Sequence, residues 1–246
     1  SLAEERSPTV VLRAFGILKG IFELAVDDNL IRQNPTDNIE LPKKVKRDRP
    51  TLTAEQVLRL ADAAGDDRRA LILVLAFEGL RWAEATGLLV KDIDFDAMRI
   101  EVGRTATKVG SEIIVEERTK NYRSRQVPMF DIVAEALRTQ VKGKSPDDLA
   151  FTDPDGHYCR QQSIAEHHTS WYSTALKKAG VPLVRIHDLR HTAASLLIAQ
   201  TASPLGVQRM LGHSSATMTL DVYANLTSAE TERVTSNFNA YLKSVR

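Results

Sequence analysis

The segment between residues 187 and 223 concentrates histidine, arginine and tyrosine in three short motifs. The motifs are His187-Asp-Leu-Arg190-His191-Thr192, Leu211-Gly212-His213 and Asp221-Val-Tyr223. Because positions three apart share one face of a helix, His187 and Arg190 are expected to project together from a helix over residues 187–200. Arginine binds two phosphate oxygens with parallel hydrogen bonds, and histidine titrates near neutral pH. The pair therefore suits a reaction in which a phosphate gains negative charge, with Tyr223 as the candidate nucleophile.

A further arginine stands upstream in the motif Gly79-Leu-Arg81-Trp-Ala-Glu84-Ala-Thr-Gly-Leu88. Together with Lys177-Lys-Ala-Gly-Val-Pro182 and the run Gly212-His-Ser-Ser-Ala-Thr-Met-Thr-Leu-Asp-Val-Tyr-Ala-Asn225, this ordered set resembles the tyrosine recombinases, the phage integrase family of DNA strand-exchange enzymes. The resemblance covers most of residues 30–225. It implies a fold that is mainly α with a small antiparallel β-sheet (α+β).

The resemblance also implies an activity. The chain would be a site-specific DNA recombinase, an integrase that cleaves and rejoins DNA through a 3′-phosphotyrosyl intermediate and so supports integration and excision. It implies no metal ion and no cofactor. The expected partners are double-stranded DNA attachment sites and further copies of the chain, which would be a monomer when free and a homotetramer on DNA. Accessory DNA-bending proteins stay an open question.

Metal-free cleavage of a phosphodiester needs a nucleophile, stabilisation of charge and an acid for the departing 5′ oxygen. By the resemblance, Arg81 and Arg190 grip the two non-bridging oxygens, a task that suits a planar, charged guanidinium. His187 would accept or relay the tyrosine proton, and His213 would form a hydrogen bond to a phosphate oxygen. Glu84, three residues after Arg81, can pair with it and hold its guanidinium in place. The candidate catalytic residues are Arg81, Lys120, His187, Arg190, His213 and Tyr223.

The general acid is expected to be a lysine. Members of the family place it in a turn between two strands of the small sheet, and residues 119–128, Thr-Lys-Asn-Tyr-Arg-Ser-Arg-Gln-Val-Pro, resemble that element. This similarity assigns the role to Lys120. A register difference of one residue stays open, and Lys108 in the preceding turn is the alternative. For His191 the resemblance implies a buried, supporting role outside the catalytic set.

The composition is that of an ordinary globular protein. Of the 246 residues 43% are apolar and 26% charged, and a formal net charge of +1 does not by itself indicate nucleic-acid binding. One local basic cluster could follow a phosphate backbone or form a solvated linker. No apolar run reaches the length of a membrane span, no signal-peptide pattern is present, and the one cysteine, Cys159, has no partner for a disulfide or a Cys-based metal site. We therefore expect a cytoplasmic protein. The basic cluster consists of Lys43, Lys44, Lys46, Arg47 and Arg49.

Two regions are expected, because the chain exceeds the usual size of a single domain. Apolar residues at helical spacing predict a long amphipathic helix over residues 9–30, and Asn34-Pro35 and Leu41-Pro42 end that pattern. Residues 1–46 resemble the C-terminal part of the family's helical core-binding domain with a linker. Residues 47–246 would form the catalytic domain with a C-terminal docking tail. Because roughly 40 residues cannot hold the whole helical domain, we expect a fragment that lacks its beginning.

The second region shows helical and extended patterns in turn. Helices are predicted from a threonine cap at 53 to residue 64, and over residues 68–77, 132–141, 163–179, 187–200 and 205–211, the last with Ser203 and Pro204 at its start. Short β-branched runs predict strands at 98–102, 112–116 and 123–127 in one small antiparallel sheet. Residues 228–246 carry an apolar stripe that would pack on its own domain or, by the resemblance, dock into a neighbouring protomer.

Three other classes of protein share some of these features. His187 and His191 have the spacing of zinc-binding helices, but Asp188 replaces the usual glutamate and Arg190 would repel a cation. A non-catalytic DNA-binding protein on the same fold would not need competent residue types at all six catalytic positions. A type IB topoisomerase-like strand transferase shares the chemistry, but the Leu-Gly-His-Ser-Ser motif and the segment around Asn34-Pro35 favour a recombinase.

Overall fold

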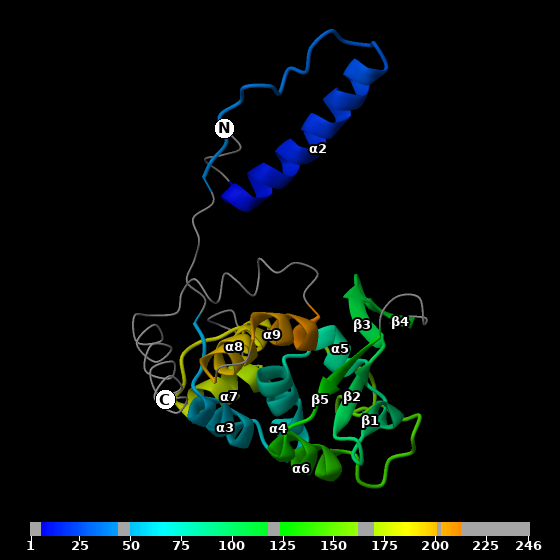
Figure 1. The fold of residues 1–246 in the computed structure, drawn as a ribbon, viewed down its shortest axis with the longest axis vertical. Coiled ribbons are helices and arrows are strands. Elements are labelled where there is room, and N and C mark those ends of the chain that lie inside the picture. Colours follow the sequence, from blue (N-terminus) through cyan, green and yellow to red (C-terminus); the bar gives the residue numbers. More distant parts are fainter. Residues whose placement is uncertain (1–5, 44–49, 118–123, 162–169, 201–202, 213–246) are drawn as a thin grey trace, which may run out of the picture. The chain divides into compact units, whose positions relative to one another are not determined.

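The computed structural model describes residues 6–43, 50–117, 124–161, 170–200 and 203–212. The chain forms two compact units, residues 1–48 and residues 49–246, and each is described by itself (Figure 1). Within the described ranges, no helix is both long enough and apolar enough to cross a membrane. The assignment of the first unit to a core-binding domain stays a prediction.

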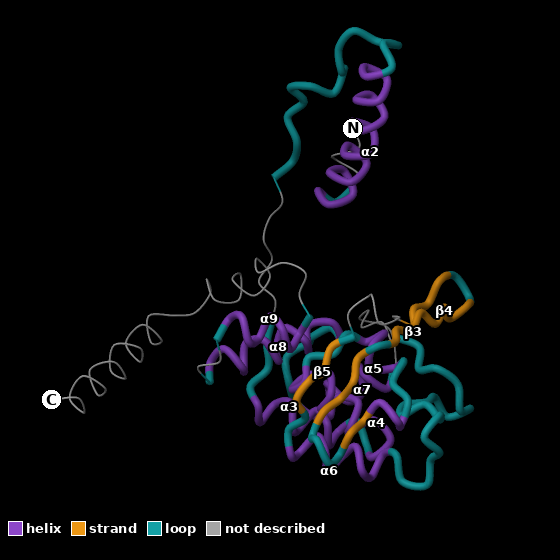
Figure 2. Tube along the Cα trace, turned by 45° about the vertical axis from the view of Figure 1, so that its right-hand side comes forward, coloured by secondary structure: helices purple, strands orange, loops and turns teal. Residues whose placement is uncertain are grey.

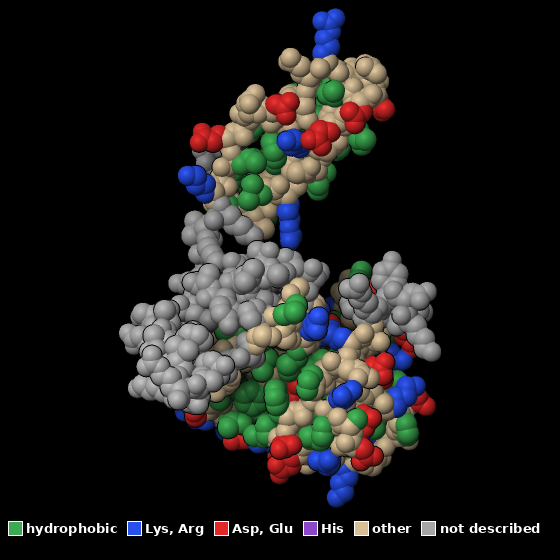
Figure 3. Space-filling model, viewed as in Figure 1, with side chains coloured by type: hydrophobic (Ala, Val, Ile, Leu, Met, Phe, Trp, Pro, Cys, Tyr) green, Lys and Arg blue, Asp and Glu red, His purple; other side chains and the backbone are tan. Residues whose placement is uncertain are grey.

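The first unit is built on one helix, α2 (Pro8–Asp27). It begins at a proline, which fits the first turn of a helix because an N–H is not needed there. The predicted break at Asn34-Pro35 is confirmed: the Asn34 side chain donates to the Lys19 carbonyl at 3.3 Å and accepts from the Thr36 backbone N–H at 2.9 Å. The helix has no buried residue. Its exposed apolar side chains include Val10, Ile17, Leu18, Ile21 and Leu24. Figure 3 shows hydrophobic side chains on the surface of this unit.

The second unit is mostly helical. Its first helix, α3 (Ala54–Ala63), has the predicted cap, since Thr53 Oγ1 accepts from the Gln56 backbone N–H and Gln56 Oε1 accepts from that of Thr53. The next helix, α4 (Asp66–Leu73), continues into a π-helical turn, Val74–Glu78. The remaining helices are α5 (Trp82–Thr86), a 3₁₀ turn (Val90–Asp92), α6 (Asp131–Gln140), α7 (Trp171–Ala179), α8 (Ile186–Ala199) and α9 (Pro204–Leu211).

The strands form two antiparallel sheets where the sequence predicted one. The first sheet has the order β1 (Ile93–Asp94), β2 (Arg99–Val102), β5 (Arg125–Pro128). The second is a hairpin of β3 (Arg104–Val109) and β4 (Glu112–Glu117), which extends beyond the helices (Figure 2). The division follows burial, because β2 alternates exposed and buried residues over the core, whereas β4 has no buried residue. The predicted fold class, mainly α with small antiparallel β-structure, is confirmed.

The core of the second unit is centred on α4 and the π-helical turn. Their residues Leu71, Leu73 and Val74 are fully buried. Helix α8 packs against the π-helical turn, and α3 packs against both α4 and α7. The helices lie on one face of the three-stranded sheet (Figures 1 and 2). This packing brings the segment after the π-helical turn, which starts at Gly79, against α8.

Glu78, at the end of the π-helical turn, is a fully buried acid. Its Oε1 accepts a hydrogen bond from the Phe130 backbone N–H at 2.8 Å, and within the part of the chain that the structure describes its Oε2 has no partner. Burial raises the pKa of Glu78 to about 8, and the hydrogen bond from Phe130 only partly opposes this effect. The carboxyl is therefore neutral at pH 7 in the folded protein.

Replacing Glu78 with Gln is expected to make stability less dependent on pH. In the unfolded chain Glu78 ionises near its ordinary pKa of 4.5. Its contribution to the free energy of unfolding therefore falls as the pH rises from about 4.5 to about 8, and is constant above that pH. The full penalty is on the order of a few kcal/mol, at about 1.4 kcal/mol per pKa unit. Urea unfolding at pH 5.5 and 8.5 measures it. We expect Glu78→Gln to gain clearly more on wild type at pH 8.5 than at pH 5.5, and an equal difference at both pH values would contradict the buried acid.

Candidate active site

Arg81 lies at the junction between the π-helical turn and α5. The chain turns at Gly79, whose φ of +67° lies in the left-handed region that favours glycine. Arg81 then precedes the first residue of α5, and its backbone N–H donates to Glu84 Oε2 at 2.8 Å. Its side chain donates through Nη1 to Glu84 Oε1, also at 2.8 Å. The predicted pairing of Arg81 with Glu84 is thus present.

Glu84 is completely buried and is held by two arginines. Besides Arg81, Arg125 from β5 donates Nη1 to Oε1 at 2.9 Å and Nη2 to Oε2 at 2.7 Å, a two-pronged ion pair. Burial alone would raise the pKa of Glu84, but the hydrogen bonds and charges of Arg125 and Arg81 outweigh it and lower the pKa to about 2. Glu84 is therefore a fixed negative charge.

Arg190 extends from α8 into the same cluster. It is only 4% exposed. Its Nη1 donates to the Gly79 carbonyl at 2.7 Å, its Nη2 donates to the Leu211 carbonyl at 2.6 Å, and Nη1 lies 3.9 Å from Glu84 Oε2. Burial, together with the positive charges of Arg81 and Arg125, lowers the pKa of Arg190 to about 9, although Glu84 opposes this shift. The guanidinium therefore still carries its charge at neutral pH.

His187 lies on α8 three residues before Arg190 and is exposed, in contrast to that arginine. Its ring meets the ring of His191 edge to face, with centroids 5.4 Å apart and an interplanar angle of 84°. His191, expected to be buried, is half-buried. The two histidines therefore lie side by side on α8, with His187 on its accessible side.

The other predicted catalytic residues, Lys120, His213 and Tyr223, lie outside the described residues, as does the predicted tail helix. Helix α9 ends at Leu211 and is followed by Gly212, whose φ is +67°. The Gly212 carbonyl accepts a hydrogen bond from Arg81 Nη2 at 3.1 Å, so the described chain ends inside the arginine cluster, one residue before His213. The alternative lysine, Lys108, lies on β3 and is exposed, opposite Ile113 of β4.

Arg125 was missed by the sequence analysis. It lies in the segment that contains the candidate Lys120, and it holds Glu84 across 41 positions of sequence. No local signal indicated it, because Arg81 alone balances the charge of Glu84 and Arg125 is distant in sequence. Lys and Arg side chains reach the surface where α5 lies beside the end of α9 (Figures 1 and 3).

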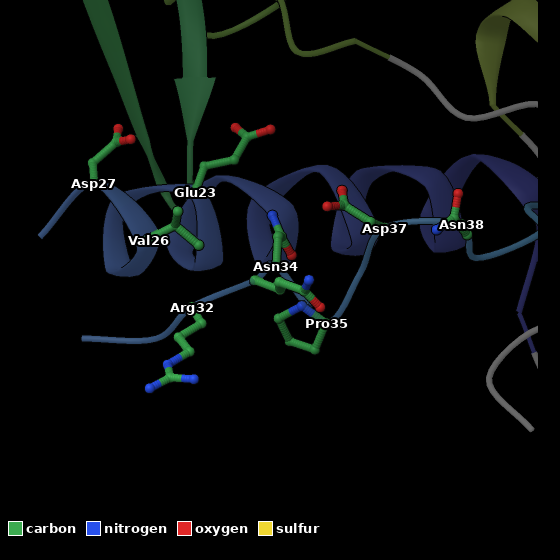
Figure 4. A pocket seen from close by; sticks show the side chains of 9 residues that line it. Glu23, Val26, Asp27, Arg32, Asn34, Pro35, Asp37 and Asn38 are labelled. Carbon is green, nitrogen blue, oxygen red and sulfur yellow. The ribbon is translucent and has the colours of Figure 1, made fainter. Parts of the chain in front are cut away.

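Other polar groups of the described residues include none of the three clustered arginines. A pocket in the first unit is lined by the end of α2 and residues 32–38 and contains none of the predicted catalytic residues (Figure 4). Among the described residues, one group of potential metal ligands was found, namely Asp153, Asp155 and His157, and it includes neither His187 nor His191. The arginine cluster is therefore the candidate active site.

Comparisons with known proteins identify the family of this chain. The chain matches the model of the phage integrase family over residues 50–230 and belongs to that family. An integrase of Mycobacterium phage D29 is 29% identical over 235 residues, which cover 92% of this chain and 61% of that protein. A XerC-like tyrosine recombinase of Caldanaerobacter subterraneus is 26% identical, covering 85% of this chain and 60% of that protein. The chain thus spans about three fifths of the length of these curated relatives.

Solved structures share the fold. The integrase of transposon Tn1549, in complex with a circular intermediate DNA, superimposes with a TM-score of 0.77 and 24% identity, over 95% of this chain and 82% of that one. Lambda integrase bound to DNA gives a TM-score of 0.63 at 18% identity, over 87% of this chain and 73% of that one. These likenesses confirm the fold inferred from the sequence.

Proposed function

We propose that this chain is the catalytic part of a site-specific DNA recombinase that cleaves and rejoins DNA through a covalent 3′-phosphotyrosyl intermediate. The observation that carries the proposal is the charge balance of the cluster. Three guanidiniums, of Arg81, Arg125 and Arg190, surround one carboxylate, Glu84. Two positive charges are left over in a largely buried site. They match the two negative charges that a phosphodiester develops as it becomes five-coordinate.

In the proposed reaction the Tyr223 oxygen attacks the scissile phosphorus, and its proton passes to His187. A bond forms between that oxygen and the phosphorus, and the bond from the phosphorus to the 5′ oxygen breaks. Lys120 gives a proton to the departing 5′ oxygen. Arg81 and Arg190 bind the non-bridging oxygens, with His213 as a further donor. Religation runs the same steps backward, so no external energy source and no metal ion are required.

The proposed partners are double-stranded DNA attachment sites and other copies of the chain, as a monomer in solution and a homotetramer on DNA. The arginine cluster supports DNA as the partner, because arginines bind the phosphate groups of its backbone. Such contacts position a protein on DNA without reading the bases. Sequence selection would then depend on base contacts elsewhere and on the ease of bending the site, which is where accessory DNA-bending proteins would act.

A nicked suicide substrate tests the proposal. Half-sites from candidate attachment sequences are incubated with the protein, and the short strand released by cleavage diffuses away, which traps any covalent product. We expect a protein–DNA adduct that resists denaturant and forms at the same rate in the presence of EDTA. Binding without an adduct would indicate a DNA-binding protein that lacks the chemistry. Relaxation of supercoiled DNA without exchange between two sites would indicate a topoisomerase-like strand transferase.

The identity of the general acid can be tested with sulfur in place of the leaving oxygen. Lys120→Ala is expected to cleave an ordinary scissile bond slowly and to regain activity on a 5′-phosphorothiolate, because the thiolate leaves without a proton. Lys108→Ala serves as the matched control and should cleave both substrates at equal relative rates. Rescue of Lys108→Ala, with none for Lys120→Ala, would transfer the role to Lys108.

A further inference from the structure

The end of α9 is bound by the whole arginine cluster. Arg125 Nε donates to the Met210 carbonyl at 3.0 Å, Arg190 Nη2 to the Leu211 carbonyl at 2.6 Å and Arg81 Nη2 to the Gly212 carbonyl at 3.1 Å. The last carbonyls of a helix lack donors within the helix and carry partial negative charge, which favours cationic partners. Three guanidiniums from three different elements thus bind three consecutive carbonyls.

Arg125 differs from the other two arginines in how its donors are used. All three of its nitrogens donate to the protein: Nη1 and Nη2 to Glu84, and Nε to Met210. Its side chain is 13% exposed, between those of Arg190 at 5% and Arg81 at 36%. What commits Arg125 to its neighbours is therefore not burial but the use of every nitrogen of its guanidinium within the protein. Arg125 is therefore suited to position its neighbours rather than to bind a ligand itself.

The backbone at the end of α9 is fitted closely to Arg125. A Cβ atom placed on Gly212 would lie 2.9 Å from Arg125 Cδ, 3.0 Å from Nε and 3.1 Å from Cζ. Real Cβ atoms essentially never lie within 3.0 Å of such an atom, so a side chain at position 212 would require the Arg125 side chain to shift. On the other side of the cluster, a Cβ on Gly79 would overlap Leu211 Cδ2. The two glycines allow the end of α9 to lie directly on the arginines.

We propose that Arg125 is a positioning residue that holds Glu84 and the end of α9 in register, and so fixes both Arg81 and the start of the segment that carries His213. The proposal rests on the recombinase function inferred above. Without Arg125, the Glu84 carboxylate would keep the two hydrogen bonds from the backbone N–H and Nη1 of Arg81 but would lose the two bonds from Arg125. The carboxylate that holds Arg81 would then be fixed by Arg81 alone, and the Met210 carbonyl would lose its donor.

Two substitutions of Arg125 separate position from charge. Arg125→Ala removes the charge and all three donors. Arg125→Lys keeps a charge beside Glu84, but one ammonium cannot reach both carboxylate oxygens and the Met210 carbonyl in the geometry of a guanidinium. Arg99→Ala is the matched control, because Arg99 lies on β2, the strand paired with β5, and donates to Gln126 rather than to Glu84.

The first measurement needs no DNA. Rotation of a guanidinium that is held at both ends is slow, so the Nη1 and Nη2 signals of Arg81 are expected to be separate in NMR spectra of the wild-type protein and of Arg99→Ala. In Arg125→Ala and Arg125→Lys the two signals should merge as Arg81 begins to rotate. Separate Arg81 signals in both Arg125 variants would overturn the proposal whatever the activity of the protein.

The second measurement is single-turnover cleavage of the suicide substrate beside half-site binding. Arg125→Lys should lose about ten- to a hundredfold in cleavage rate, a size common for groups that orient a reacting residue, with affinity within about threefold of wild type. A merely structural role predicts instead that Arg125→Lys, which keeps the charge, restores the rate. Cleavage by Arg125→Lys at the wild-type rate therefore overturns the proposal. If wild type forms no adduct, the recombinase function fails, and the NMR result alone decides the role of Arg125.

Discussion

Tyr223→Phe is expected to form no detectable covalent adduct with DNA while binding a half-site with nearly unchanged affinity. Only the oxygen that would attack the phosphorus is removed, and the aromatic ring is retained. The measurement is adduct formation on the suicide substrate, together with half-site binding under the same conditions. Peptide mapping of the wild-type adduct identifies the linked residue directly.

The described tyrosines provide the control for this experiment. Tyr172 on α7 is fully buried, and burial, with Asp188 nearby, raises the pKa of its hydroxyl above the ordinary range. It is therefore unsuited to act as a nucleophile. Tyr158 is half-buried in the turn after Thr152 and can be replaced without opening the core. Tyr158→Phe should form the adduct like wild type, and an adduct formed by Tyr223→Phe would show that another residue attacks.

Local patterns in the sequence predicted the parts of the fold that depend on neighbouring residues. The caps at Thr53 and Ser203 hydrogen bond to the backbone N–H three residues on, as their side chains suggest. The pairing of Arg81 with Glu84 follows from helical spacing in the same way. In each case the deciding partner lies within one turn of helix, so it can be identified from the chain itself.

Features that depend on distant partners could not be predicted. Periodicity indicated one helix over residues 68–77, and the widening of its last turn into a π-helix arises where α8 packs against it. The strands β3 and β4 separate from the other strands because few of their residues reach the core. A pattern of β-branched residues predicts strands but does not indicate which of them will be buried. Arg125 is bound to Glu84 and Met210 through contacts that span 41 and 85 positions, and neither separation leaves a local signal.

Arg190→Lys is expected to lose most of the cleavage activity, on the order of a hundredfold or more, corresponding to about 2.7 kcal/mol of transition-state stabilisation. Arg190 donates Nη1 to the Gly79 carbonyl and Nη2 to the Leu211 carbonyl, and in the proposed reaction its remaining N–H groups bind the phosphate. A lysine ammonium is a point charge and cannot span the two carbonyls. It would leave one of them without its donor and would not present two parallel donors to the phosphate.

Arg190→Lys would weaken both the fold and the binding of the phosphate. Measuring the free energy of unfolding as well as the cleavage rate separates these two effects. Loss of a buried hydrogen bond should lower the free energy of unfolding by about 1 to 3 kcal/mol, so the fold survives while the site loses its geometry. Arg185→Lys is the matched control, because Arg185 precedes the same helix, α8, and is exposed. We expect Arg185→Lys to cleave at close to the wild-type rate. If folded Arg190→Lys also cleaves within a few-fold of wild type, its two bonds serve only to join α8, Gly79 and the end of α9, and Arg81 must hold the phosphate without it.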